Sequence, residues 1–386
     1  MAPERSRGTA GEVFLASFSL GCRAFGGPVA HLGYFERDYV ARRAWIDGEA
    51  YAGIVALCQV LPGPTSSQVG FLVGLHRAGW RGALAAWTGF TLPSAVLMVL
   101  FALFAARADG PLIAGILHEL KLLAVAVVAL AVWSMAGKLC PDLRRALIAA
   151  AVAAAMWFLP FRGLQLLALA ASAVAGIVLC RGLPAPPRRS VGDVGVRASA
   201  LAGGAFALLL TGLSLAALWF PHSLVSLAAS MYHAGALVFG GGHVVLPLLR
   251  ESLVPEWLTD TDFLGGYGAA QALPGPLFSI AAFVGAAAAP GVAGAPGLGT
   301  AWGLVAVVAI FLPGLLLAVA GAGLWRYVAA SPGAGAAIAG VNAGVVGLLA
   351  AALYDPLWKS AVHHWSDVLI AAVLALLMNS LARPKR

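Results

Sequence analysis

Gln59-Val60-Leu61-Pro62-Gly63-Pro64 has a counterpart in the second half of the chain, Gln271-Ala272-Leu273-Pro274-Gly275-Pro276, offset by 212 positions. A second pattern repeats in the same order, because Phe25-Gly26-Gly27-Pro28 is matched by Phe239-Gly240-Gly241-Gly242 at an offset of 214. Between the two patterns, Trp45 is matched by Trp257 at an offset of 212. Three rare patterns in one order indicate an internal duplication.

Both patterns place helix breakers in apolar surroundings. Glycine and proline inside a hydrophobic span free backbone polar groups, and lipid cannot satisfy these groups. Such interruptions are tolerated where protein or a water-lined cavity covers them, and interrupted spans at matching places in two halves point to the substrate site of a transporter. We therefore predict broken helices at both patterns, and we expect Pro93 and Pro313 to break the spans that follow.

The composition is that of a membrane protein. Of the 386 residues, 61% are hydrophobic and only 10% are charged, against about 25% charged in soluble domains. We predict an all-α polytopic membrane protein with about 12 transmembrane helices, since a span needs about 20 apolar residues. The expected spans are 12–30, 50–75, 82–106, 113–137, 144–160, 163–181, 199–220, 225–248, 264–288, 300–325, 334–354 and 365–382.

A polar, proline-rich linker divides the chain. The expected organisation is an N-terminal transmembrane repeat over 1–181, the linker 182–198 and a C-terminal repeat over 199–386. The first copy of the glycine motif opens the first span and the second copy opens the eighth. Seven crossings separate them, so we predict inverted-topology repeats.

The distribution of Lys and Arg predicts the orientation. With the N-terminus inside, sixteen basic residues, Arg250 among them, fall on the inner side and seven on the outer side. This excess predicts that both termini are cytoplasmic. The exception is the outer segment with Arg37, Arg42 and Arg43, which also carries carboxylates and is expected to be a structured surface segment.

Several function classes are excluded by what the sequence lacks. The net charge of +8 comes from short loops between spans, which argues against nucleic-acid binding. The four cysteines have no metal-type or redox-type spacing, and no nucleotide-binding loop or hydrolase motif is present. No carboxylate lies deep in a span, since Glu36 and Asp38 are expected at the interface. We expect a secondary transporter, not an enzyme, with no metal or cofactor.

Two short segments are predicted helix starts. Asp47 follows Trp45 by two residues and Thr259 follows Trp257 by two. Both side chains are expected to cap the incoming helix, and Thr259 with Asp262 fits a capping box.

The glycine motifs and the proline loops carry the candidate site. A helix that restarts after a glycine pair presents unpaired N–H groups to an anion, although close helix packing explains the same glycines. Hydroxyl and amide groups near Pro64 either contact substrate or satisfy freed carbonyls. Arg23 suits an oxyanion or snorkels to the surface, and His31 and His243 are proton carriers or structural groups. The candidate substrate-binding residues are Arg23, Gly26, Gly27, His31, Gln59, Gly63, Thr65, Ser67, Gln68, Gly240, Gly241, His243, Gln271 and Gly275.

These motifs resemble those of the chromate ion transporter (CHR) family in its long two-domain form. The resemblance covers nearly the whole chain and rests on 25–31, 59–68, Ala78-Gly79-Trp80-Arg81-Gly82, 239–243 and 271–276. It departs from the family pattern at Ser66-Ser67 and at Ser279. The resemblance implies an inner-membrane protein that exports chromate and confers chromate resistance, with sulfate as a second anion.

The substrate class suits the residues, because tetrahedral dianions bind N–H groups, hydroxyls and cations without carboxylates. We predict an alternating-access exporter in the inner (plasma) membrane, with chromate and the lipid bilayer as partners. A sulfate or oxyanion uptake permease and a passive anion channel are the alternatives. A homodimer is an alternative to a monomer.

Overall fold

The structure is a computed structural model that describes residues 8–107, 111–159, 163–180, 194–238, 245–328 and 333–382. The described residues are helical and contain no strand. The first half has α1 (Ala10–Gly21), α2 (Gly27–Phe35), the π-helix η1 (Glu36–Arg42), α3 (Gly48–Val60), α4 (Thr65–Ala105), α5 (Pro111–Leu139), α6 (Leu143–Phe158) and α7 (Leu164–Leu179). The second has α8 (Val196–Trp219), α9 (Leu224–Leu237), α10 (Val245–Leu253), α11 (Asp260–Ala272), η3 (Leu277–Ser279), α12 (Ile280–Ala288), α13 (Pro296–Val328), α14 (Ala334–Ala352), the π-helix η4 (Leu353–Trp358), α15 (Lys359–Ala361) and α16 (Trp365–Ala382).

Five stretches within the described residues are long and apolar enough to cross a membrane: Thr65–Ala105, Gly115–Leu139, Val196–Trp219, Pro296–Gly323 and Ala334–Ala361. Shorter apolar helices, α1, α7 and α9 among them, accompany these. The protein is therefore a multi-pass helical membrane protein, whereas the number of twelve spans stays a prediction.

The predicted helix starts at Asp47 and Thr259 are confirmed. The Asp47 carboxylate accepts from the N–H of Ala50 at 2.8 Å, and the Thr259 hydroxyl accepts from the N–H of Asp262 at 3.1 Å. These caps satisfy donors that a helix N-terminus otherwise leaves unpaired.

The first expected span, 12–30, is not one helix. The chain leaves helical geometry between Gly21 and Gly27, and the following helices fold back along α1. The Tyr39 hydroxyl lies 2.9 Å from that of Ser17, and the Trp45 indole N–H donates to Glu12 at 2.9 Å. Later residues thus meet earlier ones, so α1, α2 and η1 form a helical hairpin with the glycine motif at its tip.

The second expected span, 50–75, is also a hairpin. Helix α3 ends at Val60, the proline loop occupies 61–64, and α4 begins at Thr65. The base of this hairpin is closed by Arg77, whose guanidinium lies 5.6 Å over the ring of Trp45 and pairs with Glu12 at 3.2 Å. The chain then reverses at Ala78 and Gly79, where Gly79 has φ +63°, and continues as the second part of α4.

The second half repeats this arrangement where it is described. His222 precedes α9 and Trp257 follows α10, and their rings lie 6.1 Å apart, so the chain between them returns to its starting level. Trp257 also contacts Trp302 at 6.1 Å, next to the end of α12. Helices α11 and α12 therefore form a second hairpin, interrupted at 273–276. The glycine segment 239–244 lies outside the described residues.

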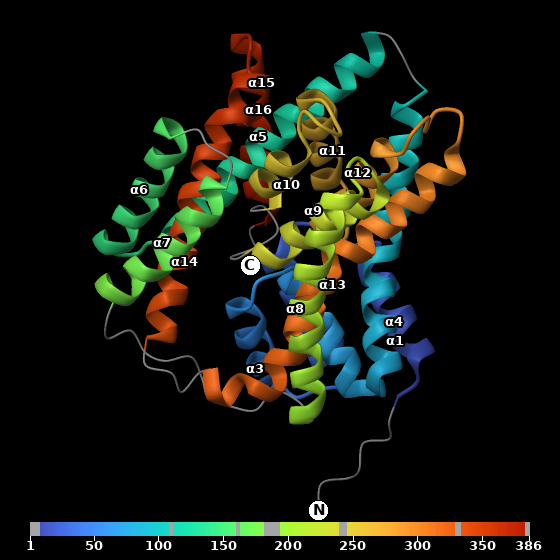
Figure 1. Cartoon of the computed structure of the whole chain (residues 1–386), viewed down its shortest axis with the longest axis vertical. Coiled ribbons are helices and arrows are strands. Elements are labelled where there is room, and N and C mark those ends of the chain that lie inside the picture. The colour runs from blue at the N-terminus through green and yellow to red at the C-terminus, as the bar shows by residue number, and fades with distance from the viewer. Residues whose placement is uncertain are drawn as a thin grey trace, which may run out of the picture.

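Two long helices run past the hairpins, the second part of α4 and α13 (Figure 1). The expectation that Pro93 and Pro313 break their spans is wrong, because both prolines lie inside continuous helices. Glycines allow close packing: a Cβ on Gly21 would lie 2.6 Å from the Phe90 carbonyl oxygen, and one on Gly235 would lie 2.0 Å from that of Ile310.

The two halves interlock. Helices α6 and α7 of the first half pack against α14 of the second, at one side of the molecule in Figure 1. A Cβ on Gly176 would lie 2.8 Å from Gly340 Cα, so α7 and α14 meet backbone to backbone. Helix α5 packs against α11 in the same way at Gly268. The boundaries 1–181, 182–198 and 199–386 remain a prediction.

Candidate functional site

The two proline loops make reciprocal backbone hydrogen bonds across the halves. The Gly63 N–H donates to the carbonyl of Val238 at 2.7 Å, and the Gly275 N–H donates to the carbonyl of Ala24 at 2.9 Å. Val238 directly precedes the second glycine motif and Ala24 the first. Each proline loop therefore contacts the residue that directly precedes the glycine motif of the other half.

Only glycine fits at the centre of each proline loop. Gly63 has φ +119° and Gly275 has φ +105°, both in the region that side chains rarely adopt. A Cβ on Gly63 would lie 2.7 Å from the Cα of Gly314 in α13, and one on Gly275 would lie 2.7 Å from the hydroxyl of Ser94 in α4. Each loop is thus pressed against the long helix of the other half.

His31 braces the first glycine motif. Its Nε2 lies 3.1 Å from the Ala24 carbonyl oxygen and its Nδ1 lies 3.3 Å from the Ser66 hydroxyl. A carbonyl only accepts, so Nε2 carries a hydrogen, and Nδ1 accepts from the Ser66 hydroxyl when the ring is neutral. The ring is buried and its edge meets Phe90 at 5.3 Å. Both ring nitrogens thus have a hydrogen-bond partner, and proton carriage by His31 stays a prediction.

Gln68 braces the first proline loop. Its amide nitrogen donates to the carbonyls of Pro62 and Gly314, each at 2.9 Å, and so ties the loop to α13. Its amide oxygen and the hydroxyl of neighbouring Ser67 are buried without a hydrogen-bond partner among the described residues. Ser279, which aligns with Ser67 in the other half, does have a partner, since its hydroxyl lies 2.6 Å from that of Ser94.

Three helices that begin at the interruptions have no side-chain cap. The residues before α2, α4 and η3 are Gly26, Pro64 and Pro276, and none accepts from the first turn. By contrast, Thr9 and Ser223 cap α1 and α9, which begin away from the interruptions. Uncapped N–H groups and the helix dipole together favour an anion.

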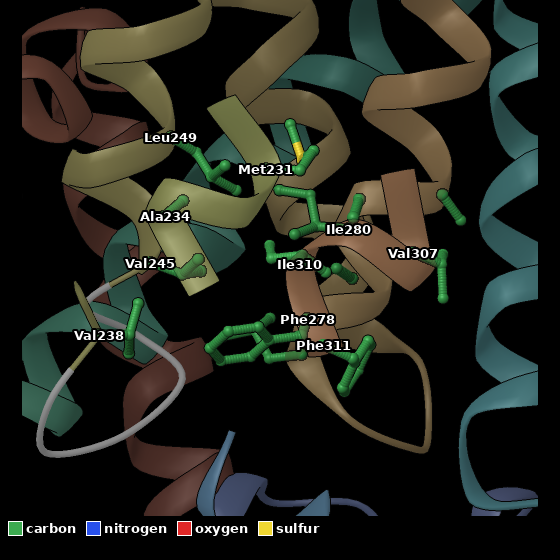
Figure 2. Close-up of a cluster of buried hydrophobic side chains, with 14 of the residues drawn as sticks. Met231, Ala234, Val238, Val245, Leu249, Phe278, Ile280, Val307, Ile310 and Phe311 are labelled. Carbon is green, nitrogen blue, oxygen red and sulfur yellow. The ribbon is translucent and has the colours of Figure 1, made fainter. Parts of the chain in front are cut away.

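Apolar side chains pack beside the second proline loop. The rings of Phe278 and Phe311 lie 5.7 Å apart, and Trp87 of α4 contacts Phe311 at 5.8 Å. Figure 2 shows Phe278 and Phe311 in one cluster with Val238 and Ile310. This packing keeps the reciprocal hydrogen bonds in an apolar environment, where they are stronger than in water.

The remaining candidates lie around this centre in different ways. Arg23 is 51% exposed and lies 3.8 Å from a carboxylate oxygen of Asp38. Gln59 is exposed near the end of α3, and the side chain of Gln271 hydrogen-bonds that of Tyr267. Thr65 is buried at the start of α4, and Gly27 is the first residue of α2. The candidates Gly240, Gly241 and His243 lie outside the described residues.

Sequence reasoning missed several residues of this centre. Ser94 and Gly314 were not candidates, although each follows a proline, Pro93 or Pro313, that was expected to break its span. Ala24 and Val238 contribute only carbonyl oxygens, which no side-chain pattern reveals. Asp38, expected at the interface, is 5% exposed.

Long apolar helices define this chain as a multi-pass membrane protein, and paired internal interruptions are typical of the substrate site of a transporter. The profile of the family described as chromate transporter matches residues 11–177 and 225–384. The chain is 30% identical to a chromate transport protein of Pseudomonas aeruginosa over 89% of its length and 80% of that protein. It is 27% identical to the chromate transport protein of Cupriavidus metallidurans over 93% of its length and 86% of that protein.

A probable chromate transport protein of Synechococcus elongatus is 26% identical over 92% of the chain and 86% of that protein. No solved structure matches the chain. The chain belongs to the chromate transporter family.

Proposed function

We propose that this protein exports chromate across the inner (plasma) membrane as a secondary transporter and so confers chromate resistance. The observation that carries the proposal is the convergence of both proline loops with the residues that precede both glycine motifs. The proposed substrate comes from the names of two relatives, both chromate transport proteins, which are similar to this protein over most of the chain.

The proposed binding site uses the uncapped helix starts at the interruptions. Chromate, a tetrahedral dianion, would accept hydrogen bonds from the first N–H groups of α2 and α4 and from the unpartnered hydroxyl of Ser67. Arg23 would add a guanidinium whose parallel donors match two oxygens of the anion. The glycines of the proline loops and the residues Gln68 and His31 would hold this frame in place.

The transport cycle we propose is alternating access between two inverted repeats. Two hydrogen bonds related by the duplication, from Gly63 and from Gly275, close the two halves on each other. Breaking one of these two hydrogen bonds while keeping the other would expose the site to one side of the membrane at a time. Inverted repeats move in this way around a fixed central site.

The membrane potential favours export. Each charge moved across the membrane gains about 2.3 kcal/mol per 100 mV. A dianion leaving a negative-inside cell therefore gains roughly twice that amount at 100 mV, and outward movement needs no ATP on that account.

The proposal is tested by chromate flux in inverted vesicles, with Ser67→Ala and Arg23→Gln beside matched controls. Ser172→Ala removes a buried hydroxyl that donates to the Ala168 carbonyl within α7, and Arg107→Gln removes a guanidinium that donates to the Ala293 carbonyl. We expect site variants to lose most of the flux and the controls to retain it. Equal flux in all four proteins at equal expression would remove Ser67 and Arg23 from the site.

The same vesicles distinguish the alternatives. Flux that follows the applied voltage with no dependence on a proton gradient would identify a passive anion channel. Sulfate uptake that restores growth of a transport-deficient host would identify an uptake permease.

A further inference from the structure

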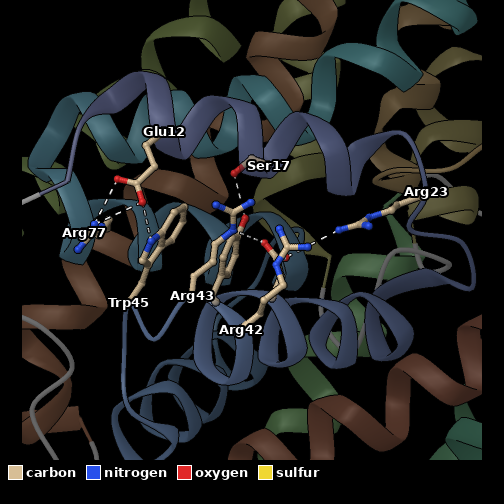
Figure 3. A network of polar contacts seen from close by, with 9 residues as sticks. Glu12, Ser17, Arg23, Arg42, Arg43, Trp45 and Arg77 are labelled. Carbon is tan, nitrogen blue, oxygen red and sulfur yellow. Dashed lines mark hydrogen bonds and ion pairs between the residues drawn. The ribbon is translucent and has the colours of Figure 1, made fainter.

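One buried carboxylate faces three guanidiniums beside the first hairpin tip. Asp38 Oδ1 lies 3.1 Å from Arg42 Nε and 3.8 Å from Arg23 Nη2, and Oδ2 accepts a hydrogen bond from Arg43 Nε at 2.8 Å. Figure 3 shows the side chains of Arg23, which follows α1, and of Arg42 and Arg43, at the end of η1, turned toward one another. We name these four residues the Asp38 cluster.

The Asp38 cluster carries an excess of positive charge. A single carboxylate neutralises one guanidinium and leaves two formal positive charges. The carboxylate of Glu12 in α1 is engaged by Arg77 and by the indole of Trp45. The excess matches the charge of a divalent oxyanion.

The three arginines are held to different degrees. Arg43 is mostly buried, hydrogen-bonds Asp38 and lies 5.2 Å over the ring of Trp45, so it is fixed. Arg23 and Arg42 are 51% and 60% exposed. The distance of 3.8 Å from Arg23 to Asp38 is too long for a hydrogen bond. Arg23 and Arg42 therefore keep most of their donors available.

The position of the Asp38 cluster along the hairpin favours water around its exposed guanidiniums. The Asp38 cluster lies along the hairpin between its tip and its base, because Tyr39 meets Ser17 in the middle of α1. Exposed guanidiniums at such a place do not face hydrocarbon, and charged groups within membrane proteins face a water-filled cavity or a partner. Arg23 also stands three residues before Gly26, which directly precedes the uncapped start of α2.

We propose that Arg23 and Arg42 form a recruitment site that captures a divalent tetrahedral oxyanion before it reaches the proline loops. Asp38 and Arg43 hold the two exposed guanidiniums in reach, and the anion replaces Asp38 as the partner of Arg23. Arg23 then passes the anion from this site toward the start of α2. This inference rests on the proposed function for the identity of the anion.

The test compares Arg42→Gln with Arg37→Gln in sulfate binding and in chromate flux. Arg37 belongs to the same helix η1, but its guanidinium lies over Tyr34 and donates to the Gly33 carbonyl, away from the Asp38 cluster. Binding is measured as the sulfate-dependent rise in melting temperature of the purified protein, against chloride at equal ionic strength. Flux is measured in inverted vesicles at several salt concentrations.

We expect Arg42→Gln to raise the KM for chromate by about three- to tenfold, the range for one charged hydrogen bond reduced by solvent screening. It should also weaken the dependence of KM on salt and the stabilisation by sulfate, while kcat changes much less. Arg37→Gln should match the wild type.

Arg42→Lys is the control for a folding defect, because it keeps the charge and loses the planar fork. Its KM and its stabilisation by sulfate should lie between those of Arg42→Gln and the wild type. If Arg42→Gln, Arg42→Lys and Arg37→Gln all match the wild type in KM and in stabilisation by sulfate, the inference is overturned. If sulfate stabilises the protein in an Arg42-dependent way but no chromate moves, the recruitment site stands and the proposed function fails.

Discussion

Replacing Gly63 with alanine should displace the first proline loop. The residue has φ +119°, and a Cβ there would lie 2.7 Å from Gly314 Cα and 2.9 Å from the amide nitrogen of Gln68. A strained backbone conformation costs about 1–3 kcal/mol, and overpacking costs about 1–3 kcal/mol more. We therefore expect Gly63→Ala to destabilise the closed arrangement by about 2–6 kcal/mol.

The loop can relieve this strain only by moving away from α13, and that movement breaks the hydrogen bond from Gly63 to Val238. We expect a lower melting temperature of the detergent-purified protein and at least a tenfold loss of chromate flux, since about 1.4 kcal/mol already corresponds to tenfold. Gly275→Ala should behave alike, because its Cβ would meet Ser94 at 2.7 Å.

The matched control is Gly33→Ala in α2. Nothing lies within 4 Å of a Cβ there, and the residue is helical, so the change should be neutral or stabilise by up to about 1 kcal/mol. Should Gly63→Ala melt and transport as Gly33→Ala does, the loop does not pack against α13 and the reciprocal contact is not part of the mechanism.

Two further predictions concern the side chains that hold the loops. Gln68→Leu leaves the carbonyls of Pro62 and Gly314 without their side-chain donor, and should cost about 2–4 kcal/mol, measured by thermal unfolding; an unchanged melting temperature would contradict the bracing role. Ser94→Ala and Ser279→Ala should be non-additive in a double-mutant cycle, with about 1 kcal/mol of coupling, whereas additive effects would show that the two hydroxyls do not interact.

The positions of the two proline loops were predictable because adjacent proline and glycine act on their own backbone, whereas the breaks expected at Pro93 and Pro313 do not occur. The proline loops at 61–64 and 273–276 fall where the pattern placed them. What happens after each interruption was not predictable. Hydropathy indicates that a stretch is buried but not in which direction its chain runs. An apolar stretch that forms a hairpin therefore has the same hydropathy as one that crosses the membrane once. The reversal depends on contacts such as that of Tyr39 with Ser17, which no local pattern encodes.

The polar residues near the interruptions were identified, but their roles were not. Gln68 and His31 were candidates for substrate contact, and in the structure they bind backbone carbonyls. A sequence shows a donor near a proline and does not show which carbonyl lies within its reach. Asp38 was expected at the interface for the same reason: its three arginine partners converge only when η1 folds back along α1.

The hairpins change which loops share a side of the membrane. With 12–30 as a single crossing, the segment of Arg42 and Gly48 lies opposite the N-terminus. As a hairpin, it returns to the same side, and its arginines join the other inner basic residues. Arg250, which the twelve-span scheme puts on the side of the N-terminus, is reassigned to the opposite side, because α10 returns toward the level of His222. The balance still favours a cytoplasmic N-terminus.

This topology is testable with single cysteines. Gly48→Cys and Gly297→Cys add side chains at exposed positions with nothing within 4 Å, in a background without the native cysteines. With the N-terminus cytoplasmic, an impermeant maleimide should label Gly48→Cys in inverted vesicles and Gly297→Cys in intact cells. The control position, Gly297, is outside under both topologies. Labelling of Gly48→Cys from outside would require α1 and α2 to cross the membrane as one span, and the reciprocal contacts between hairpin tips and proline loops would then have no geometric basis.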